Sequence, residues 1–530
     1  MESKNVNETS NTEIITISRA EYDELMAAKA KNAELSQQNN WLMERLKLNN
    51  KKLFGSSSEK TEQEDSDQLC LFNEAEAFAD ERAPEPEISD VKAHHRKKSE
   101  SKDRLPEDLE IEIVEHKLSD EELACPQCGH ELHVMGKEVV SEQLKIIPAK
   151  AILVQNVRYT YSCRNCENND TSVPVIKAPV PNAVIKGGFA TPEAVSYIMT
   201  QKYVLDVPLN RMENDFKRRD IHLSRQTMCN WIMKCSEDWL EPIFEKLHEE
   251  LLHHDVVFAD ETTIQVLKEP EKKPQSKSYM WLYRTDKYAP RQVALYDYAS
   301  SRSAKNAQQF LKGFSGYLHC DGYQAYKTLP EDIVLVGCLA HVRRKFDEAL
   351  NCLTDDQRKS SKAKVGMDYC NKIFEMERSF EELTPEGRLM KRQELVNTVL
   401  DEFLSWLNSF NPAKQSHLGR AVEYAQRQLP YVSNYLRDGR LEASNNRAEH
   451  LAKSFAVCRK NFLFSNTPRG ATPSAVTLSV IATAMENGPD PYKYLTYVFR
   501  DAPNIDLNND EAFSRLLPWN APDNTRFAAN

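Results

Sequence analysis

The 530-residue chain lacks the features that would direct it to a membrane or to the secretory route. No stretch approaches the roughly 20 consecutive apolar residues that a membrane-spanning helix needs. The N-terminus, MESKNVNETSNTEIITIS, has no basic segment followed by an apolar one, so the pattern of a signal peptide is missing. We therefore expect a cytoplasmic protein without membrane contact. Its length predicts at least three folded units.

A basic excess is also absent, because 69 Lys and Arg stand against 80 Asp and Glu, a formal net charge of −11. Phosphate binding needs clustered basic residues, so the balance argues against nucleic acid as a partner. The position of the charges changes this conclusion. Twelve acids lie between Glu59 and Asp90 with only Lys60 and Arg82 among them, and the rest of the chain is nearly neutral with local basic clusters. We expect an acidic, disordered linker over residues 55–110.

The spacing of the cysteines does not indicate a disulfide framework. Of the 12 cysteines, four form two C-x-x-C pairs and the rest are scattered singly, which suits a reducing compartment with one metal site. Four thiolates fill a tetrahedral zinc site, so its role should be structural or in DNA contact, not catalytic. The sequence predicts a zinc-binding β module over residues 115–175, with one Zn²⁺ held by Cys125, Cys128, Cys163 and Cys166.

A heptad pattern from Leu25 to Leu53 places Leu, Ala and Asn at the core positions of a short coiled coil. We expect this leucine-zipper-like segment, residues 17–54, to make the protein a homo-oligomer. The alternative is a single amphipathic helix that packs on its own chain.

Helical patterns follow over residues 185–251, with one helix from about Pro192, a second from about Pro208 to Arg219 and a third capped by Ser224. The short link DIHL gives helix-turn-helix spacing, which predicts binding to double-stranded DNA. The candidate contacts are Arg218 and Arg219 near phosphates, and the recognition-helix side chains Arg225, Gln226, Asn230 and Lys234. Short helix pairs are common in α-rich proteins, so a purely structural role stays open.

Strand patterns then begin, with a helix between them and a helix at the end. The expected strands are 255–267, 278–285, 292–300, 316–326 and one that runs into a helix over 332–350; the first helix spans about 304–314. This mixed α/β order favours a ribonuclease-H-like sheet. Residues 351–438 are helical and charged, which predicts an all-α insertion.

Two carboxylates fall at strand ends in this layout. Asp260 ends the first strand and Asp321 the fourth, and neighbouring strands would bring both to the same edge. Two divalent cations about 4 Å apart need several carboxylates as ligands to activate water against a phosphodiester and to stabilise the leaving oxygen. A lone acid at a strand end is more often a cap or a solvated group. A helix after Gly439 is expected to carry Glu442, Asn445, Asn446 and Glu449.

Four blocks in order, FADET, HCDGYQAY, GCLAHVRRKF and LEASNNRAEHLAKSFAVCRKNFLFSNTPRG, resemble the signature blocks of the insertion-sequence-66 family of DDE transposases. With the zipper, the zinc module and the helical segment, the resemblance covers nearly the whole chain. It implies a ribonuclease-H-like core in which Asp260, Asp321 and a Glu bind two Mg²⁺. It also implies a transposase that cuts at the ends of its element and joins the 3′-OH to target DNA, in a bacterial cytoplasm and on the nucleoid when bound to DNA. Elements of this family often carry two small accessory reading frames, whose products are candidate partners.

The resemblance leaves the third carboxylate to be chosen. Glu442 is preferred to Glu449 because it opens an E-x-x-N-N motif that resembles the catalytic-helix motif of related enzymes. Asn445 and Asn446 would orient a ligand or a phosphate, with helix capping as the alternative. The remaining expected DNA contacts are His341, Arg343 and Arg344, which resemble a family C-x-x-H block, together with Arg459 and Lys460.

Departures from the family pattern leave the three carboxylates intact. Where many members read D-N-N-A-A-E-R the chain has SNNRAEH, and Cys458 stands where Gly is frequent. A domesticated, inactive copy, a non-catalytic DNA-binding regulator and a nuclease without strand transfer therefore remain as alternatives. The full layout places the catalytic core with its insertion at 252–486 and a tail at 487–530, which we expect to pack one helix on the core and to be loose beyond Asn504.

Overall fold

The computed structural model describes residues 18–29, 31, 151–157, 159–162, 175–177, 179–462 and 465–527. The chain divides into two compact units, one built mainly from residues 181–527 and one from residues 57–180 with the last three residues. No helix in the part described is long and apolar enough to cross a membrane.

In the described part of the smaller unit, β1 (Thr160–Ser162) pairs antiparallel with β2 (Val175–Lys177). The cysteines expected to hold zinc, Cys125, Cys128, Cys163 and Cys166, lie outside the described residues. The N-terminal residues 19–29 form a helix on which Leu25, Met26 and Ala28 are exposed, and the heptad core positions from Asn32 onward lie outside the described residues.

The larger unit begins with the helices that the sequence predicted. α4 (Pro192–Tyr203) starts at an N-cap Thr191, and α5 (Leu209–Arg218) follows Pro208. α6 (Arg225–Cys235) starts at Ser224, whose hydroxyl accepts the N–H of Thr227 as a helix cap should. A π-helical turn, η3 (Ser236–Leu240), leads into α7 (Glu241–Leu252).

A five-stranded sheet forms the centre of this unit and confirms the mixed α/β class. Its strands are β3 (Val256–Gln265), β4 (Lys277–Thr285), β5 (Ala294–Ala299), β6 (Gly316–His319) and β7 (Ile333–Val336). The spatial order is β5-β4-β3-β6-β7, in which β3, β4 and β5 pair antiparallel and β3, β6 and β7 pair parallel. The helix α8 (Ala304–Phe310) provides the crossover between β5 and β6.

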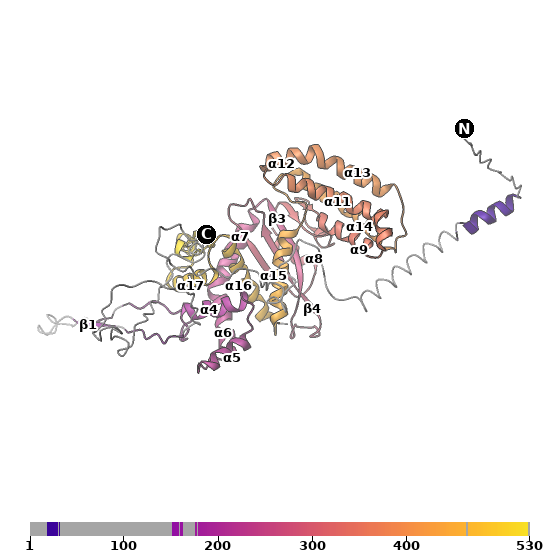
Figure 1. The fold of residues 1–530 in the computed structure, drawn as a ribbon. Helices are drawn as coiled ribbons and strands as arrows, with labels where there is room; N and C mark the ends of the chain where they lie inside the picture. The colour runs from indigo at the N-terminus through magenta and orange to yellow at the C-terminus, as the bar shows by residue number, and fades with distance from the viewer. Residues whose placement is uncertain are drawn as a thin grey trace, which may run out of the picture. The chain divides into compact units, whose positions relative to one another are not determined.

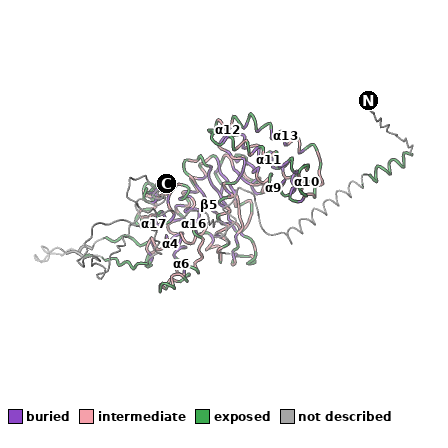
Figure 2. Tube along the Cα trace, viewed as in Figure 1, coloured by how far each residue is buried: buried purple, intermediate pink, exposed green. Residues whose placement is uncertain are grey.

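The alternation of β3 side chains divides the apolar core into two clusters. Val257 and Ala259 enter one cluster, whereas Val256 and Phe258 enter the other. Two long helices, α15 (Asn446–Phe462) and α16 (Pro468–Glu486), contact β3, β4 and β5 and lie alongside the sheet in Figure 1. Figure 2 shows the buried residues following the sheet, while exposed residues line the outer helices such as α12 and α13.

Both edges of the sheet are hydrogen-bonded to helical segments. On β5, the hydroxyls of Ser479 and Thr483 accept the N–H groups of Tyr296 and Ala294 at 2.8 and 3.1 Å. On β7, the carbonyl of Leu335 accepts the side-chain amide of Asn434 at 2.8 Å. Edge strands usually leave such backbone groups open to other chains.

All the secondary-structure elements between Asn351 and Gly439 are helices. Figure 1 shows these helices gathered with α9 in one bundle. We refer to this segment as the helical insertion. Its main helices, after α9 (Leu339–Leu350), are α10 (Asp355–Lys359), α11 (Lys362–Ser379), α12 (Pro385–Lys391), α13 (Asn397–Asn408) and α14 (His417–Val432).

The segment by which the helical insertion returns to the sheet is held by Arg392, whose side chain is 1% exposed. Its guanidinium pairs with Glu377 at 2.6 Å and donates to the carbonyl of Asp438 at 3.2 Å. Gly439 packs so closely that an added Cβ would lie 1.7 Å from the carbonyl oxygen of Pro385. The helical insertion therefore fixes the chain directly before α15.

The C-terminal residues pack on the core more fully than expected. α17 (Pro491–Asp501) contacts α4 and buries Tyr494, Leu495 and Phe499. The expectation of a loose chain beyond Asn504 is wrong, because α18 (Asp510–Ser514) buries Phe513 and the carbonyl of Leu516 accepts the Tyr494 hydroxyl at 2.7 Å. A few apolar residues within this polar stretch, such as Phe513 and Leu516, are enough to anchor the C-terminal segment on the core.

Candidate catalytic site

Asp260 lies in the middle of β3, not at its end as the sequence suggested, because β4 continues to pair as far as Gln265. Alternation along the strand places Asp260 on the face of Phe258 and Glu261 on the opposite face. The first face carries the cluster that contains α9 and the start of α15, and the second carries Trp281 and Tyr326. The two neighbouring carboxylates therefore meet different surroundings.

Asp321 follows β6, the parallel neighbour of β3. Phe258 pairs with His319, so two residues further along each strand Asp260 and Asp321 emerge at the same edge. β6 ends at His319, earlier than predicted, because the Asp321 carboxylate accepts the N–H of Tyr323 at 2.8 Å and turns the chain.

The electrostatics of Asp260 show that negative charge gathers here. Burial, together with the neighbouring charges of Glu261, Asp321 and Glu449, raises the pKa of Asp260 to about 7. A bound cation would offset this repulsion, and carboxylate oxygens are the ligands that Mg²⁺ prefers. The residues present thus fit a divalent metal ion.

Glu261 is the better neutralised member of the pair. Its side chain is 1% exposed, and Arg302 contacts one carboxylate oxygen through both Nε and Nη2. The other oxygen accepts the hydroxyl of Tyr326 at 2.7 Å. Burial, followed by the charge of Asp321, raises the pKa of Glu261, whereas Tyr326 and Arg302 lower it. Arg302 was not among the predicted site residues, because it stands in an unremarkable SSRSA stretch. The two tyrosines of the HCDGYQAY block were the available signal.

The helix expected to carry Glu442 and Asn445 begins only at Asn446, so both residues precede it and that expectation is wrong. The reason is a contact from elsewhere in the sequence. Asn445 is 1% exposed, donates its side-chain amide to the carbonyl of Ala259 at 2.8 Å and donates its backbone N–H to the thiol of Cys338 at 3.2 Å. Asn445 thus joins the start of α15 to β3, and Asn446 is exposed.

Glu449 lies in the first turn of α15, beside residues of α9. Its carboxylate is 3.4 Å from Nε2 of His341 and 3.7 Å from Arg344. Burial lowers the pKa of His341, against the opposing effect of Glu449. The described residues contain one group of three potential metal ligands within 4.8 Å of one another, Cys338, His341 and Glu449.

Glu442 has different neighbours. Its backbone N–H donates to Nε2 of His319 at 3.3 Å. Burial raises the pKa of Glu442, and the charges of Arg447, Lys287 and Arg284 oppose this effect. Asp260 and Asp321 are not among the residues whose charges act on Glu442 most strongly.

The other candidate DNA contacts in the core divide into two groups. Arg343 donates to Asn371 of α11 at 2.7 Å, and Arg459 contacts the hydroxyl of Thr263 on β3 at 2.7 Å. Both side chains are thus engaged within the protein, although Arg343 is exposed. Arg344 and Lys460 are exposed, and Arg344 is directed at Glu449.

The six candidate residues of the helix pair all lie on its surface: Arg218, Arg219, Arg225, Gln226, Asn230 and Lys234. Several are paired along their own helices, as in Arg219 with Asp215 and Lys234 with Asp238, each at 2.7 Å. Exposed pairs of this kind are weak, so these side chains can exchange partners for phosphates.

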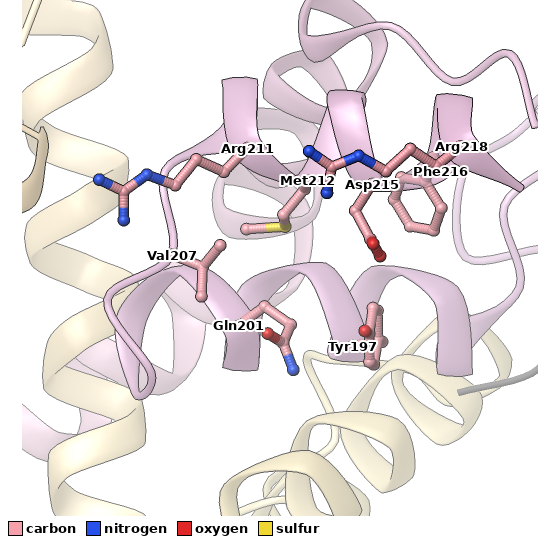
Figure 3. A pocket seen from close by; sticks show the side chains of 8 residues that line it. All are labelled: Tyr197, Gln201, Val207, Arg211, Met212, Asp215, Phe216 and Arg218. Atoms are coloured by element: carbon pink, nitrogen blue, oxygen red, sulfur yellow. The ribbon is translucent and has the colours of Figure 1, made fainter. Parts of the chain in front are cut away.

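A cleft of about 280 Å³ lies between α4 and α5. Figure 3 shows Tyr197 and Gln201 from α4 facing Met212, Asp215 and Phe216 from α5. Other lining residues are Val207, Arg211 and Arg218. The lining combines apolar and charged side chains, and no sequence motif drew attention to it.

Fold and site together define a mixed α/β protein with a cluster of carboxylates at the junction of two parallel strands and a crossing helix. The family described as "Transposase IS66 family" matches residues 187–473. Three further families match: "zinc-finger binding domain of transposase IS66" at 122–167, "Transposase C of IS166 homeodomain" at 41–114 and "IS66 C-terminal element" at 479–519. The chain belongs to the IS66 family of transposases, which confirms the resemblance found in the sequence.

Relatives of similar length exist in Sinorhizobium fredii (strain NBRC 101917 / NGR234). The uncharacterized protein y4jD is 32% identical over 420 residues, covering 76% of this chain and 79% of that protein. The uncharacterized protein y4hP is 29% identical over 496 residues, covering 88% of this chain and 86% of that protein. These relatives support the extent of the family match and carry no assigned activity.

Proposed function

We propose that the protein is a DNA transposase that cuts at the ends of its element and joins the 3′-OH to target DNA by phosphoryl transfer at Asp260, Asp321 and Glu449. The observation that carries this proposal is the parallel pairing of β3 with β6, which brings Asp260 and Asp321 to one edge below the start of α15. The strand order β5-β4-β3-β6-β7 also supports a ribonuclease-H-like core.

Glu449 replaces Glu442 as the proposed third carboxylate. The charge of Glu449 acts on Asp260, whereas the surroundings of Glu442 are dominated by Arg447, Lys287 and Arg284. His341 and Arg344 lie within 3.4 and 3.7 Å of the Glu449 carboxylate and would orient it. Asn445 would hold the beginning of α15 against β3 through the carbonyl of Ala259.

Asp260, Asp321 and Glu449 would hold two Mg²⁺. When bound, these ions supply Lewis acidity and neutralise the charge that develops on the phosphate. The protein itself would align the nucleophile and the phosphodiester by fixing the three carboxylates on two strands and one helix. It would also keep Glu261, already paired with Arg302, out of the reaction.

Double-stranded DNA would be bound chiefly by α5 and α6, whose exposed basic residues include Arg218 and Arg225. Asn445 and Arg459, expected from the sequence to contact DNA, are better explained as links between α15 and β3. The family match over 122–167 supports zinc binding, and we assign one structural Zn²⁺ to Cys125, Cys128, Cys163 and Cys166. Oligomer formation through the N-terminal segment and a need for accessory proteins belong to the same proposal.

The test uses the full-length, zinc-loaded protein, Mg²⁺ and double-stranded DNA that carries the inverted repeats flanking the gene. Cleavage is measured on intact ends, and joining on a pre-cut end with a free 3′-OH. Metal-assisted charge stabilisation is worth several kcal/mol, so D260N, D321N and E449Q should each lose at least about a hundredfold in cleavage rate. E442Q is the matched control and should remain within about tenfold of the wild type.

DNA binding by all four variants, measured by mobility shift, separates chemistry from recognition. Loss of activity in E442Q with retention in E449Q would return the third carboxylate to Glu442. Cutting without joining would identify a nuclease without strand transfer. Binding with neither reaction, by the wild type itself, would identify a non-catalytic regulator or an inactive copy.

A further inference from the structure

We propose that Arg302 is a positioning residue that, anchored by Glu261, fixes the loop carrying Asp321 and thereby sets the affinity of the carboxylate cluster for divalent cations. The inference rests on the proposed function, since it assumes that Asp260 and Asp321 bind those cations. It assigns a role to a residue outside the motif blocks and to the acidic residue beside Asp260.

Arg302 is held in place by two contacts with Glu261 and two with Tyr323. Its Nε donates to the Glu261 carboxylate at 2.6 Å, and Nη2 contacts the same oxygen. The guanidinium lies 3.6 Å from the centre of the Tyr323 ring, over its face. The Tyr323 hydroxyl in turn donates to the carbonyl oxygen of Arg302 at 2.5 Å. A planar guanidinium that is both paired and stacked has little freedom to move.

The anchor is itself fixed. Glu261 lies on β3, where its second carboxylate oxygen accepts the Tyr326 hydroxyl at 2.7 Å. Tyr326 is 1% exposed and packs edge-on against Trp281 of β4, at 5.9 Å between ring centres. The position of Arg302 is therefore set by the sheet and not by the surface loop from which it comes.

Asp321 completes the network. One carboxylate oxygen accepts the N–H of Tyr323 at 2.8 Å, and the other lies 3.8 Å from Nη2 of Arg302. Tyr323 thus links the two residues: its backbone N–H contacts Asp321, and its ring and hydroxyl contact Arg302. Asp321, Tyr323 and Tyr326 form a D-x-Y-x-x-Y pattern whose three side chains all serve the same loop geometry.

The charges favour an effect on metal binding beyond simple stability. Arg302 is neutralised at close range by Glu261 and stands farther from Asp321, so the Asp321 charge stays available to a cation. The side chains of Arg302 and Asp321 are both partly exposed, at 37% and 24%. Residues that hold metal ligands from behind commonly change metal affinity by about 10- to 100-fold.

The principal variant is the double substitution E261Q/R302Q, which removes one positive and one negative charge and so leaves the net charge unchanged. Mn²⁺ binding to the full-length, zinc-loaded protein without DNA is measured from the electron paramagnetic resonance signal of free Mn²⁺. The D260N/D321N variant defines binding at all other sites. We expect E261Q/R302Q to weaken the remaining, carboxylate-dependent Mn²⁺ binding by about tenfold.

The matched control is E250Q/R291Q, which removes an ion pair of 2.9 Å on the surface and should bind Mn²⁺ like the wild type. R302K is a second variant, to be used if E261Q/R302Q fails to fold. It keeps the positive charge but loses the forked contact and the stacking, so it should also bind Mn²⁺ more weakly than the wild type. Wild-type affinity in a folded E261Q/R302Q, or in R302K where the double variant is unfolded, would overturn the inference. Equal Mn²⁺ binding by the wild type and D260N/D321N would instead overturn the proposed function, and this inference with it.

Discussion

Adjacent residues on one strand can have opposite roles because side chains alternate between faces. Asp260 faces the start of α15 and gathers unneutralised negative charge, whereas Glu261 faces the other core and is neutralised by Arg302. A carboxylate that lacks a fixed cationic partner can take a metal ion, and one that is already paired cannot do so without losing its partner. The FADET block therefore contains one candidate ligand and one anchor.

A second buried carboxylate, that of Asp297, should make the stability of the protein depend on pH. Asp297 on β5 has its pKa raised to about 7 by burial alone. In the unfolded chain the group titrates near 3.9, so between about pH 4 and 7 the folded state binds more protons than the unfolded state. Stability should therefore fall as the pH rises through this window. D297N removes the titration, and its melting temperature should exceed that of the wild type increasingly from pH 4 to pH 7.

The exposed Asp332 provides the comparison for this measurement. D332N should follow the wild-type melting temperature at every pH. A constant offset between D297N and the wild type from pH 4 to pH 8 would show that the charge of Asp297 is already offset in the folded protein.

The sequence predicted two of the proposed catalytic residues and favoured Glu442, not Glu449, as the third. Asp260 and Asp321 stand in motif blocks, and strand patterns indicated that they meet. Glu442 and Glu449 could not be separated by spacing, because the start of α15 depends on Asn445 bonding to Ala259, a residue of β3 far away in the sequence. Arg302 lies in no motif block, and its role arises from its contacts with Glu261 and Tyr323 and its distance to Asp321, so only the two tyrosines of the HCDGYQAY block hinted at it.

At the scale of elements, the helical insertion supports the site from a distance. Arg392 connects α11, through Glu377, to the chain segment that enters α15. The carbonyls of Tyr435 and Gly439 lie within 3.5 Å of the same guanidinium. The helical insertion is thereby coupled to the element that carries Glu449.

Removal of this buried guanidinium should destabilise the larger unit. R392M leaves the carboxylate of Glu377 without its partner, and breaking one side of a buried ion pair typically costs about 3–5 kcal/mol. Urea unfolding followed by tryptophan fluorescence should show the loss as a lower transition midpoint.

Lys391, the preceding residue, is the matched control because its pair with Glu394 is at the surface. K391M should change the free energy of unfolding by less than about 0.5 kcal/mol. Equal effects of R392M and K391M would mean that the helical insertion does not depend on the buried pair.

Elements were predicted better than their boundaries. All five strands of the sheet and the helices α4 to α6 followed from alternation, helical period and capping residues. Asp260 was predicted to stand at the end of β3, because the sequence does not show that β4 pairs with β3 beyond this residue. The tail beyond Asn504 was misjudged because its packing depends on the buried side chains of Phe513 and Leu516 and on a hydrogen bond from Tyr494 to the carbonyl of Leu516.

For the whole molecule, the distribution of charge matters more than its sum. The acidic stretch between Glu59 and Asp90 holds a surplus of ten negative charges out of a net −11. Such a stretch repels DNA over a distance that salt shortens. Replacing the acids of residues 61–90 by Asn and Gln should tighten binding to double-stranded DNA by about tenfold at low salt, measured by fluorescence anisotropy.

The same segment with its residues in scrambled order keeps the charge and should bind DNA like the wild type. The gain from neutralisation should shrink as salt is raised. A gain that persists at high salt, or that also follows scrambling, would point to a contact of the segment and not to its charge.

The hydrogen bonds along both margins of the sheet limit how copies of this protein can assemble. Ser479 and Thr483 hydrogen-bond to backbone N–H groups of β5, and Asn434 hydrogen-bonds to a backbone carbonyl of β7. Neither strand therefore offers a completely free row of backbone groups to a second molecule. Continuous strand pairing between two copies of this sheet would first have to break these hydrogen bonds. Copies that are brought together on two DNA ends would therefore meet more readily through helices or through the DNA itself.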